Sequence, residues 1–552
     1  MSANDQQPDL PPDYYRTNFH TLITFVDDTY GELLSLDERV WLTTIRQCSK
    51  AAQFLYIRLL LRKAMAFRQS RLDYPEIDDL PAAAQELAAT TLASNIAPEA
   101  LPIILSCYTR PELEKLLDIK RFKALPRADL VDTLNADDSD QHRAILQEAD
   151  QWISVAGHEK WLVFSLCFFG NPYQNISEFV LRDLGVVRYE TYSIDQASRV
   201  FKSRDQIDAH LQCFEIAALF DIVDDRDADA LLELATGLPK RYARDINLCR
   251  RIDRLRNRIA RQLERLNKAD AALSLYRLSE RPPSRERQVR LLLAQGDVRD
   301  AAVLCDRMLA LPLNDIELQF AVRTLRKIAI AENRSVKPQP RFQPQLTRLS
   351  LHRGAGRVEQ VARQFYLRFG ECYEVENSLI NSVLGLFIWD IMFMPVSGAF
   401  FNPFQSAPAD FSEPDFIRAR QTAFDKRFKE YDAPECFRNR VLSNYRSKQG
   451  ISNRMVHWEK LTESLLMLSL ERIPVADWRV MFQRALADMR ENRKGLPDLV
   501  LFPESGGYEF IEIKGPGDAL QAHQRRWMQF FHTHNIPCRV VHIRWSREKT
   551  SG

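Results

Sequence analysis

Residues 495–518 have the sequence GLPDLVLFPESGGYEFIEIKGPGD, which predicts the fold of the C-terminal part of the chain. Its two apolar runs, 498–502 and 508–514, are separated by PESGG, a connection rich in turn-forming residues. Short apolar runs joined in this way predict two antiparallel strands. We expect the resulting hairpin to be symmetric about Ser505.

The predicted hairpin places two carboxylates opposite each other. Asp498 would face Glu512 with Cβ atoms roughly 5 Å apart, and Lys514 would share that face of the hairpin. Two facing carboxylates repel unless a cation lies between them, and all-oxygen ligation is typical of Mg²⁺ or Mn²⁺. The pattern indicates a hydrolytic metal site in which Lys514 orients or polarises the attacking water; a surface hairpin with salt-bridging charges is the alternative. The opposite face of the hairpin would point toward a core and carries Leu499, Leu501, Ile511 and Ile513.

The composition is that of a globular chain with several domains. At 552 residues, with 45% hydrophobic and 27% charged residues, roughly three or four domains are expected. Because 76 Lys and Arg residues balance 74 Asp and Glu residues, any affinity for nucleic acid must come from local patches. The nine cysteines lack zinc-type spacing, and the N-terminus lacks a secretory signal, which predicts a reducing intracellular compartment.

The most apolar segment, 383–401, is interrupted by Asp390 and Pro395. A buried core helix is therefore expected there rather than a membrane span. Near the N-terminus, AAQFLYIRLLLRKAMAFR (51–68) has helical periodicity with interleaved basic residues. Those residues would contact phosphate or form a solvated face. They are Arg58, Arg62 and Lys63.

Residues 108–135 predict two short helices separated by an extended link. Thr109 and Glu112 have the spacing of a capping box, and Pro126 marks the second helix start. The segment resembles a SAP motif, a helix–link–helix DNA-binding module, although short helical pairs also occur elsewhere. Basic residues surround the link, among them Lys120, Lys123 and Arg127.

The stretch 241–268 predicts a helix with two distinct faces. One face carries an apolar stripe, whereas the other carries arginines at three- and four-residue steps, which indicates either contact with a nucleic-acid backbone or a solvated face. The repeated Asp-Ala-Ala pattern at 270–272 and 300–302 suggests helical hairpins of the TPR kind, and 334–345 is Pro-rich like a linker. The arginine ridge comprises Arg250, Arg254, Arg258, Arg261 and Arg265.

Pro497-Asp498 followed by Glu512-Ile513-Lys514 has the form of a PD-(D/E)xK nuclease site. The run NRKGLPDLVLF…IEIKGPGDALQAHQRRW closely resembles the VRR-NUC domain of the Fanconi-associated nuclease family. The resemblance extends to YYRTNF (14–19), to the SAP-like segment and to VENSLINSVLGLFIWDIMF (375–393), so it covers nearly the whole chain.

The resemblance implies a structure-selective, metal-dependent DNA nuclease that cuts near 5′ flaps, degrades from the 5′ side and serves interstrand crosslink repair. It implies Mg²⁺ or Mn²⁺ held by Glu376, Asp498, Glu512 and the carbonyl of Ile513. Lys514 would be the catalytic lysine, and Gln524 would contact water or phosphate. The basic residues Arg490, Arg493 and Lys494, ahead of the first strand, are candidate phosphate ligands.

We therefore expect predominantly α-helical N-terminal regions followed by a C-terminal α/β PD-(D/E)xK domain with a mixed β-sheet. Branched or flapped duplex DNA is the expected partner. The ubiquitin-binding zinc finger of animal members is not found, which suggests a bacterial homologue that is cytoplasmic and nucleoid-associated. A resolvase-like nuclease for Holliday junctions and an inactive DNA-binding scaffold remain alternatives. The expected domains are a helical DNA-binding domain (1–106), a SAP-like segment (107–140), TPR-like repeats (141–335), a linker (336–366) and the VRR-NUC domain (367–552).

Overall fold

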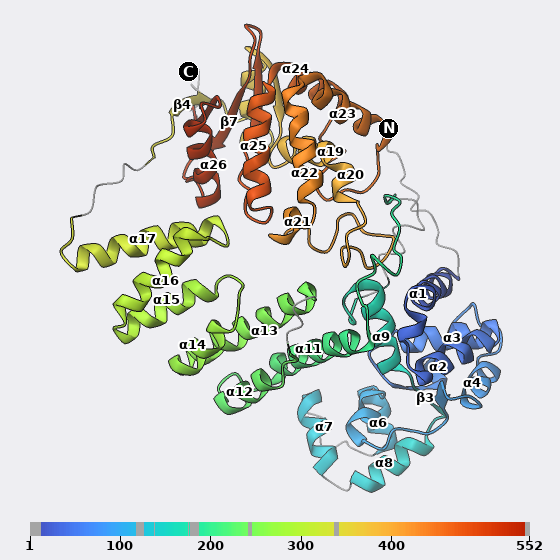
Figure 1. Cartoon of the computed structure of the whole chain (residues 1–552). Helices are drawn as coiled ribbons and strands as arrows, with labels where there is room; N and C mark the ends of the chain where they lie inside the picture. Colours follow the sequence, from blue (N-terminus) through green and yellow to red (C-terminus); the bar gives the residue numbers. More distant parts are fainter. Residues whose placement is uncertain are drawn as a thin grey trace, which may run out of the picture. The chain divides into compact units, whose positions relative to one another are not determined.

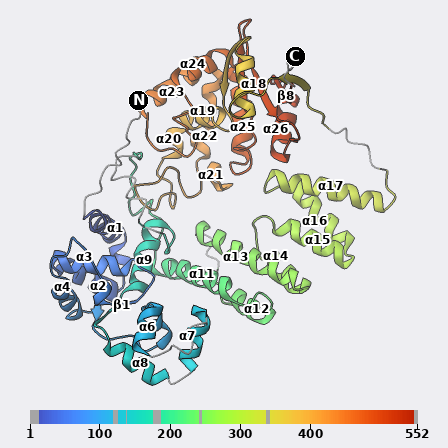
Figure 2. The same cartoon turned by 180° about the vertical axis from the view of Figure 1, so that it is seen from behind.

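In the computed structural model, the chain forms two compact units. Figures 1 and 2 show the chain from opposite sides. The first unit comprises residues 1–186 and 201–211, and the second comprises 187–200 and 212–552. No helix of the described residues is long and apolar enough to cross a membrane. The residues that the structure describes are 13–117, 126–136, 139–174, 176, 187–240, 245–335 and 342–546.

The first unit begins with a helical core, as the N-terminal periodicity predicted, but the helix expected over 51–68 ends at Leu60, and Ala66–Arg68 form a strand. Ser35 starts α2 with a reciprocal capping box, in which its hydroxyl accepts from Glu38 N and its own N donates to Glu38 Oε2. A small antiparallel sheet of order β1-β3-β2 accompanies the helices. Strands of two to four residues are too short for a period-two pattern to reveal them. The elements are α1 (Tyr14–Tyr30), α2 (Leu36–Gln47), α3 (Lys50–Leu60), β1 (Ala66–Arg68), α4 (Leu80–Ala88), β2 (Ala93–Ser94), β3 (Trp152–Val155) and α9 (His158–Phe169).

The SAP-like segment contains two short helices at the predicted positions. The capping box at the first of them is confirmed, because Thr109 N donates to Glu112 Oε2 at 2.7 Å. Lys120 and Lys123 lie outside the described residues. A DNA-binding role of the segment stays a prediction. These two helices are α6 (Arg110–Leu116) and α7 (Arg127–Ala136); α5 (Leu101–Ser106) precedes the segment, and α8 (Ser139–Glu148) begins at its end.

The helical part of the second unit is a stack in which each helix from α12 to α17 packs on the next (Figure 1). Asp270 and Asp300 both lie in the first turn of their helices, at the equivalent places that the repeated pattern predicted. The buried stripe of α13 is also confirmed and includes Leu248, Ile252, Leu255, Ile259 and Leu263. The helices are α11 (Arg204–Ile222, shared with the first unit), α12 (Ala228–Thr236), α13 (Ile246–Arg265), α14 (Ala269–Arg277), α15 (Ser284–Gln295), α16 (Val298–Ala310) and α17 (Asp315–Ala331).

A five-stranded mixed sheet of order β4-β8-β7-β6-β5 forms the centre of the C-terminal domain, as predicted for a nuclease fold. β8 is parallel to β4 and β7, whereas β6 is antiparallel to β7 and β5. α18 covers one face, and a larger helical core covers the other. The strands are β4 (Leu346–Leu351), β5 (Gly370–Glu374), β6 (Leu499–Pro503), β7 (Glu509–Lys514) and β8 (Cys538–Trp545).

The expected linker at 336–366 is wrong over most of its length. Residues 346–351 form the edge strand β4, and α18 (Val358–Tyr366) packs on the sheet. The partner of β4 is β8, about 190 residues away, so no local signal revealed the strand. Residues 336–341 lie outside the described part of the chain.

The apolar segment at 383–401 lies in the core, as predicted. Asp390, which interrupts it, is exposed and accepts two hydrogen bonds from Arg427 Nη2, at 2.8 and 2.7 Å. The helices of this domain are α19 (Leu379–Phe387), α20 (Trp389–Met392), α21 (Asp415–Arg418), α22 (Gln421–Phe428), α23 (Pro434–Ser447), α24 (Glu463–Arg472), α25 (Val475–Ala487) and α26 (Ala522–Thr533).

Candidate active site

The hairpin of β6 and β7 has the predicted register. Leu499 pairs with Ile511 and Leu501 with Glu509, so the axis lies at Ser505 and Asp498 falls opposite Glu512. The predicted apolar face is also confirmed, since it packs on α18. Its members are Leu499, Leu501, Ile511 and Ile513.

The carboxylates lie on the other face of the sheet and are almost completely withdrawn from water. Asp498 is 8% exposed, Glu512 0% and Lys514 8%. Asp498 Oδ2 accepts from Ile513 N at 2.8 Å, and Glu512 Oε1 accepts from Lys514 Nζ at 2.6 Å. Glu512 Oε2 is buried and has no hydrogen-bond partner in the described part of the chain. One buried carboxylate oxygen in the site thus lacks a hydrogen bond that would offset the cost of its burial.

Burial raises the pKa of both carboxyls. The pKa of Glu512 is raised further by the charge of Asp498, while the ammonium of Lys514 acts in the opposite direction on both. The positive charge of Lys514 therefore does not offset the effect of burial on the pKa of the two carboxyls. The site as a whole therefore has more negative than positive charge, and an additional cation would balance it.

Glu376 lies at the turn between β5 and α19, within electrostatic reach of this pair. Its negative charge raises the pKa of both Asp498 and Glu512. The turn is joined to β6 because Val375 N donates to the backbone oxygen of Asp498 at 2.7 Å. The neighbouring acids have other partners, since Glu371 accepts from Tyr373 and Glu374 pairs with Arg357.

The donor set fits a divalent cation. Two buried carboxylates with a free oxygen on Glu512 supply the hard ligands and the negative charge that Mg²⁺ or Mn²⁺ prefers. In the described ranges, no three His, Cys, Asp or Glu side chains are close enough to form a metal site by themselves. The roles of Glu376 and of the Ile513 carbonyl as further ligands stay predictions.

Gln524 lies in the first turn of α26, where its side chain has a structural task. Its Oε1 accepts from Gln521 N at 3.0 Å and so completes the capping box of that helix. The helix start also contacts the loop before β6. A Cβ on Gly495, which has φ +78°, would lie 2.3–2.9 Å from His523 and Gln524 atoms. Contact of Gln524 with water or phosphate stays a prediction.

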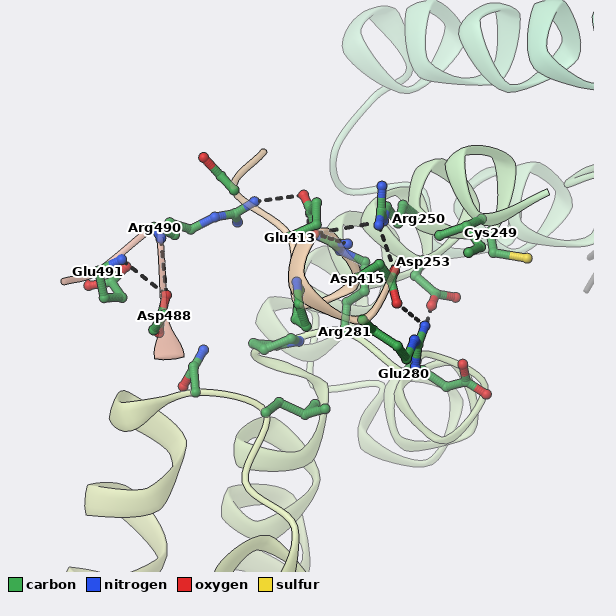
Figure 3. A pocket seen from close by; sticks show the side chains of 17 residues that line it. Cys249, Arg250, Asp253, Glu280, Arg281, Glu413, Asp415, Asp488, Arg490 and Glu491 are labelled. Carbon is green, nitrogen blue, oxygen red and sulfur yellow. Dashed lines mark hydrogen bonds and ion pairs between the residues drawn. The ribbon is translucent and has the colours of Figure 1, made fainter. Parts of the chain in front are cut away.

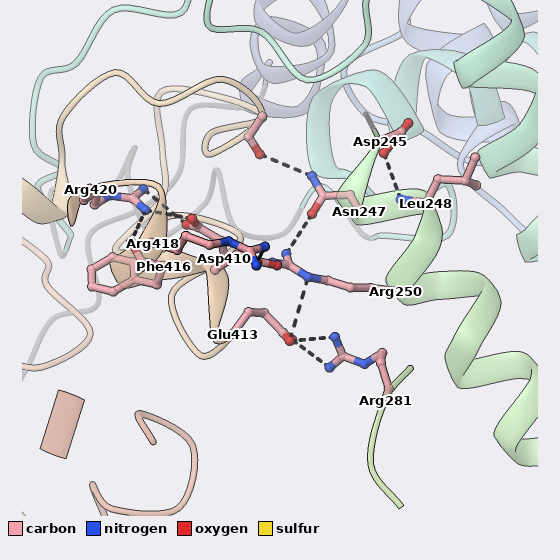
Figure 4. Close-up of polar contacts among 12 residues, drawn as sticks. Asp245, Asn247, Leu248, Arg250, Arg281, Asp410, Glu413, Phe416, Arg418 and Arg420 are labelled. Atoms are coloured by element: carbon pink, nitrogen blue, oxygen red, sulfur yellow. Dashed lines mark hydrogen bonds and ion pairs between the residues drawn. The ribbon is translucent and has the colours of Figure 1, made fainter. Parts of the chain in front are cut away.

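Glu413 joins the arginine ridge of α13 to the C-terminal domain (Figures 3 and 4). Its Oε2 accepts from Arg281 Nη1 at 2.7 Å and lies 3.8 Å from Arg250 Nε, while its Oε1 accepts from Arg490 Nη2 at 2.9 Å. Arg250 is buried and also donates to Asp415 at 2.6 Å. These groups line a cavity of about 800 Å³.

Three of the other ridge arginines also have carboxylate partners, whereas Arg265 Nη1 donates to the amide oxygen of Gln262 at 3.1 Å. Arg254 lies 3.4 Å from Glu413, Arg258 donates to Asp221 at 2.5 Å, and Arg261 pairs with Glu264 at 2.8 Å. Glu413 could not be identified from the sequence as a partner of the ridge, because it lies in a loop about 160 residues from Arg250 and Arg254. The amphipathic pattern located the ridge but contained no information about its partners. Phosphate contact by these arginines stays a prediction.

The remaining candidate DNA-binding residues fall into two groups. Some have structural partners: Arg58 binds Glu76 at 2.8 Å, Arg127 donates to the carbonyls of Leu105 and Tyr108, and Arg493 donates to Met489 O. Others have exposed side chains that no carboxylate of the described residues pairs with. These are Arg62, Lys63 and Lys494.

Comparison with known proteins agrees with this geometry. The family model described as "VRR-NUC domain" matches residues 433–545, and the one described as "FAN1, HTH domain" matches residues 13–94. Glu376 therefore lies outside both matched ranges.

The similarity to known chains extends over nearly the full length of this chain. The Fanconi-associated nuclease 1 homolog of Pseudomonas aeruginosa is 34% identical, covering 98% of this chain and 97% of the relative. Fanconi-associated nuclease 1 of Homo sapiens is 24% identical over 96% of this chain and 62% of its own length. A crystal structure of paFAN1 bound to 2nt 5′ flap DNA with gap superposes with a TM-score of 0.84 at 32% identity, covering 98% of this chain and 100% of that one. Both the site geometry and the full-length similarity place this chain in the Fanconi-associated nuclease family of structure-selective DNA nucleases.

Proposed function

We propose that the chain cuts 5′ flaps near their junction and degrades DNA in the 5′-to-3′ direction, using Mg²⁺ or Mn²⁺. The buried Asp498–Glu512 pair beside Lys514, with one carboxylate oxygen unpartnered, is the observation that carries this proposal. Support for the flap substrate comes from the similar paFAN1 chain, which was solved with 5′ flap DNA. Interstrand crosslink repair at the nucleoid of a bacterial cytoplasm is the proposed setting.

In phosphodiester hydrolysis, some residues of the site would hold the cation, and Lys514 would act on the water and the phosphate. Asp498, Glu512, the Ile513 carbonyl and Glu376 would hold the cation. When bound, a divalent cation lowers the pKa of water and stabilises charge on the phosphate. Lys514 Nζ lies on the same face and can orient the attacking water or donate to a phosphate oxygen as charge develops there. The backbone N–H of Ile513 fixes Asp498, so its carboxylate needs no reorganisation during the reaction.

Recognition of DNA should depend on shape more than on base sequence. The exposed cations Arg62, Lys63 and Lys494 suit contacts to phosphate, which carry no base information. Lys494 is four residues before Asp498 and can hold the backbone close to the scissile bond. Arg62 and Lys63 belong to the first unit and would add phosphate contacts there.

A resolvase-like activity on Holliday junctions is the second candidate. All residues of the catalytic pattern lie in the C-terminal domain, so the chemistry itself does not require the N-terminal helical regions. The full-length similarity to a flap-bound relative favours the flap substrate. An inactive scaffold is the third candidate. It is disfavoured because Asp498, Glu512 and Lys514 are all present and gathered at one site.

Purified protein should be incubated in Mn²⁺ with three labelled substrates of matched sequence: a 5′ flap, a blunt duplex and a four-way junction. We expect fastest cutting on the flap, close to the junction. Faster cutting of the four-way junction would support the resolvase alternative. Binding of all three without cutting, in either Mn²⁺ or Mg²⁺, would support the scaffold.

A further inference from the structure

The loop before β6 is tied to the turn that carries Glu376. Asn381 Nδ2 donates to Arg493 O at 3.0 Å, and Leu496 N donates to Asn377 Oδ1 at 3.1 Å. A third bond, from Val375 N to the backbone oxygen of Asp498, continues the same seam. The two segments are more than 110 residues apart in sequence. Two of the three bonds require an asparagine side chain.

Asn377 is built into this seam by both its backbone and its side chain. Its φ of +51° lies in the left-handed region, which asparagine tolerates better than most residues. While its Oδ1 holds the loop, its Nδ2 donates to Glu376 Oε1 at 3.3 Å. The same amide therefore contacts the loop leading to Asp498 and the carboxylate of Glu376.

Asn381 lies one turn later, on α19, and is 4% exposed. Its Nδ2 is shared between Asn377 O, at 2.8 Å, and Arg493 O. A buried amide costs free energy unless it is hydrogen-bonded, so this residue is costly to retain in an otherwise apolar helix. Its hydrogen bonds fix the Asn377 turn and the loop together.

α19 itself cannot shift easily to compensate for a lost bond. Ser382 Oγ, on the neighbouring residue of the helix, accepts from His457 N at 3.0 Å. A Cβ on Gly385 would lie 2.7 Å from Met455 Cβ, which shows how closely the helix approaches that loop. The position of Glu376 relative to Asp498 therefore depends on the asparagine side-chain bonds together with the backbone bond from Val375 N to Asp498 O.

We propose that Asn377 and Asn381 are positioning residues that hold Glu376 in place relative to Asp498 and so set the affinity of the site for its divalent cation. The inference rests on the proposed ligand set. Residues that orient metal ligands typically contribute 10- to 100-fold to metal affinity. Neither asparagine touches the substrate or the cation in this scheme.

Binding of Mn²⁺ to the full chain without DNA tests the inference, using the EPR signal of free Mn²⁺. Asn377→Gly keeps the positive φ but removes both side-chain bonds, and Asn377→Asp keeps the acceptor for Leu496 N but removes the donor to Glu376. Asn381→Ala removes the bond to Arg493 O in the loop and the bond to Asn377 O in the turn. We expect Asn377→Gly and Asn381→Ala to weaken Mn²⁺ binding about 10-fold or more. Saturating Mn²⁺ should restore most flap cleavage.

Asn444→Ala is the matched control. Asn444 Nδ2 donates to Leu386 O at 2.7 Å, so this variant also loses an asparagine–carbonyl bond to α19 but lies outside the seam. Its thermal stability should fall, whereas its Mn²⁺ affinity should equal that of the wild type. If Asn381→Ala fails to fold, the two Asn377 variants carry the test.

Glu376→Gln separates the possible failures. If this variant binds Mn²⁺ like the wild type, Glu376 is not a ligand, and both the ligand set and the inference are overturned. If it binds weakly while Asn377→Gly and Asn381→Ala bind like Asn444→Ala, the inference alone is overturned.

Discussion

Removing one charge from the Asp498–Glu512 pair should stabilise the metal-free protein while abolishing cleavage. Asp498→Asn is the sharpest change, because the amide oxygen can still accept the hydrogen bond from Ile513 N. Two charges about 5 Å apart repel by about 3 kcal/mol at an effective dielectric constant of about 20. The attraction of Asp498 to Lys514 is lost at the same time. We therefore expect a net gain of about 1–2 kcal/mol.

The difference in stability between Asp498→Asn and the wild type should depend on pH. Burial raises the pKa of Asp498, so the wild type loses stability as pH rises from the unfolded value, about 3.9, through the folded-state value. Asparagine does not titrate. The advantage of Asp498→Asn should therefore be small near pH 4 and largest near pH 8.

Thermal unfolding in EDTA, followed by calorimetry and by the fluorescence of the buried Trp478 and Trp527, measures this gain. For a domain of about 200 residues, 1–2 kcal/mol corresponds to a rise in Tm of roughly 2–8 °C. Mn²⁺ should stabilise the wild type but not the variant, so the difference in Tm between the two proteins should be smaller in Mn²⁺ than in EDTA. Equal or lower stability of Asp498→Asn in EDTA near pH 8 would refute the proposed repulsion.

Three further changes test other parts of the account. Lys514→Met should lower flap cleavage by about 10²-fold or more while binding persists, as measured by single-turnover kinetics and a binding titration; unchanged cleavage would remove Lys514 from the reaction. Glu413→Gln leaves arginines without their buried carboxylate and should destabilise the second unit by about 3–5 kcal/mol, whereas a Tm like that of the wild type would contradict the structural role of Glu413. Arg62→Ala with Lys63→Ala should reduce the salt slope of DNA binding by about 2 without changing Tm, and an unaltered slope would exclude phosphate contact there.

The sequence predicted best what is encoded locally. The hairpin register followed from a symmetric turn around Ser505 and from period-two alternation, which together permit one pairing that buries the apolar face. The capping box at Thr109 and the buried stripe of α13 are likewise set by neighbours within a few residues. These features need no knowledge of distant partners.

Features that depend on distant pairing were missed or left open. β4 was assigned to a linker because its partner β8 lies far along the chain. The ridge arginines were found, but Glu413 and Asp415, which pair with Arg250, have no local signature. Asn377 and Asn381 look like ordinary polar residues in sequence. Only the fold shows that they join the turn of Glu376 to the loop before β6.

The central claim is that the β6–β7 hairpin is the metal-dependent nuclease centre. The most direct test is cleavage of a labelled 5′-flap duplex in Mn²⁺ by the wild type, by Asp498→Ala and by the wild type with EDTA. We expect cutting near the junction by the wild type alone, with flap binding retained by the variant. Cleavage by Asp498→Ala at the wild-type rate, or cleavage by the wild type in EDTA, would contradict the claim.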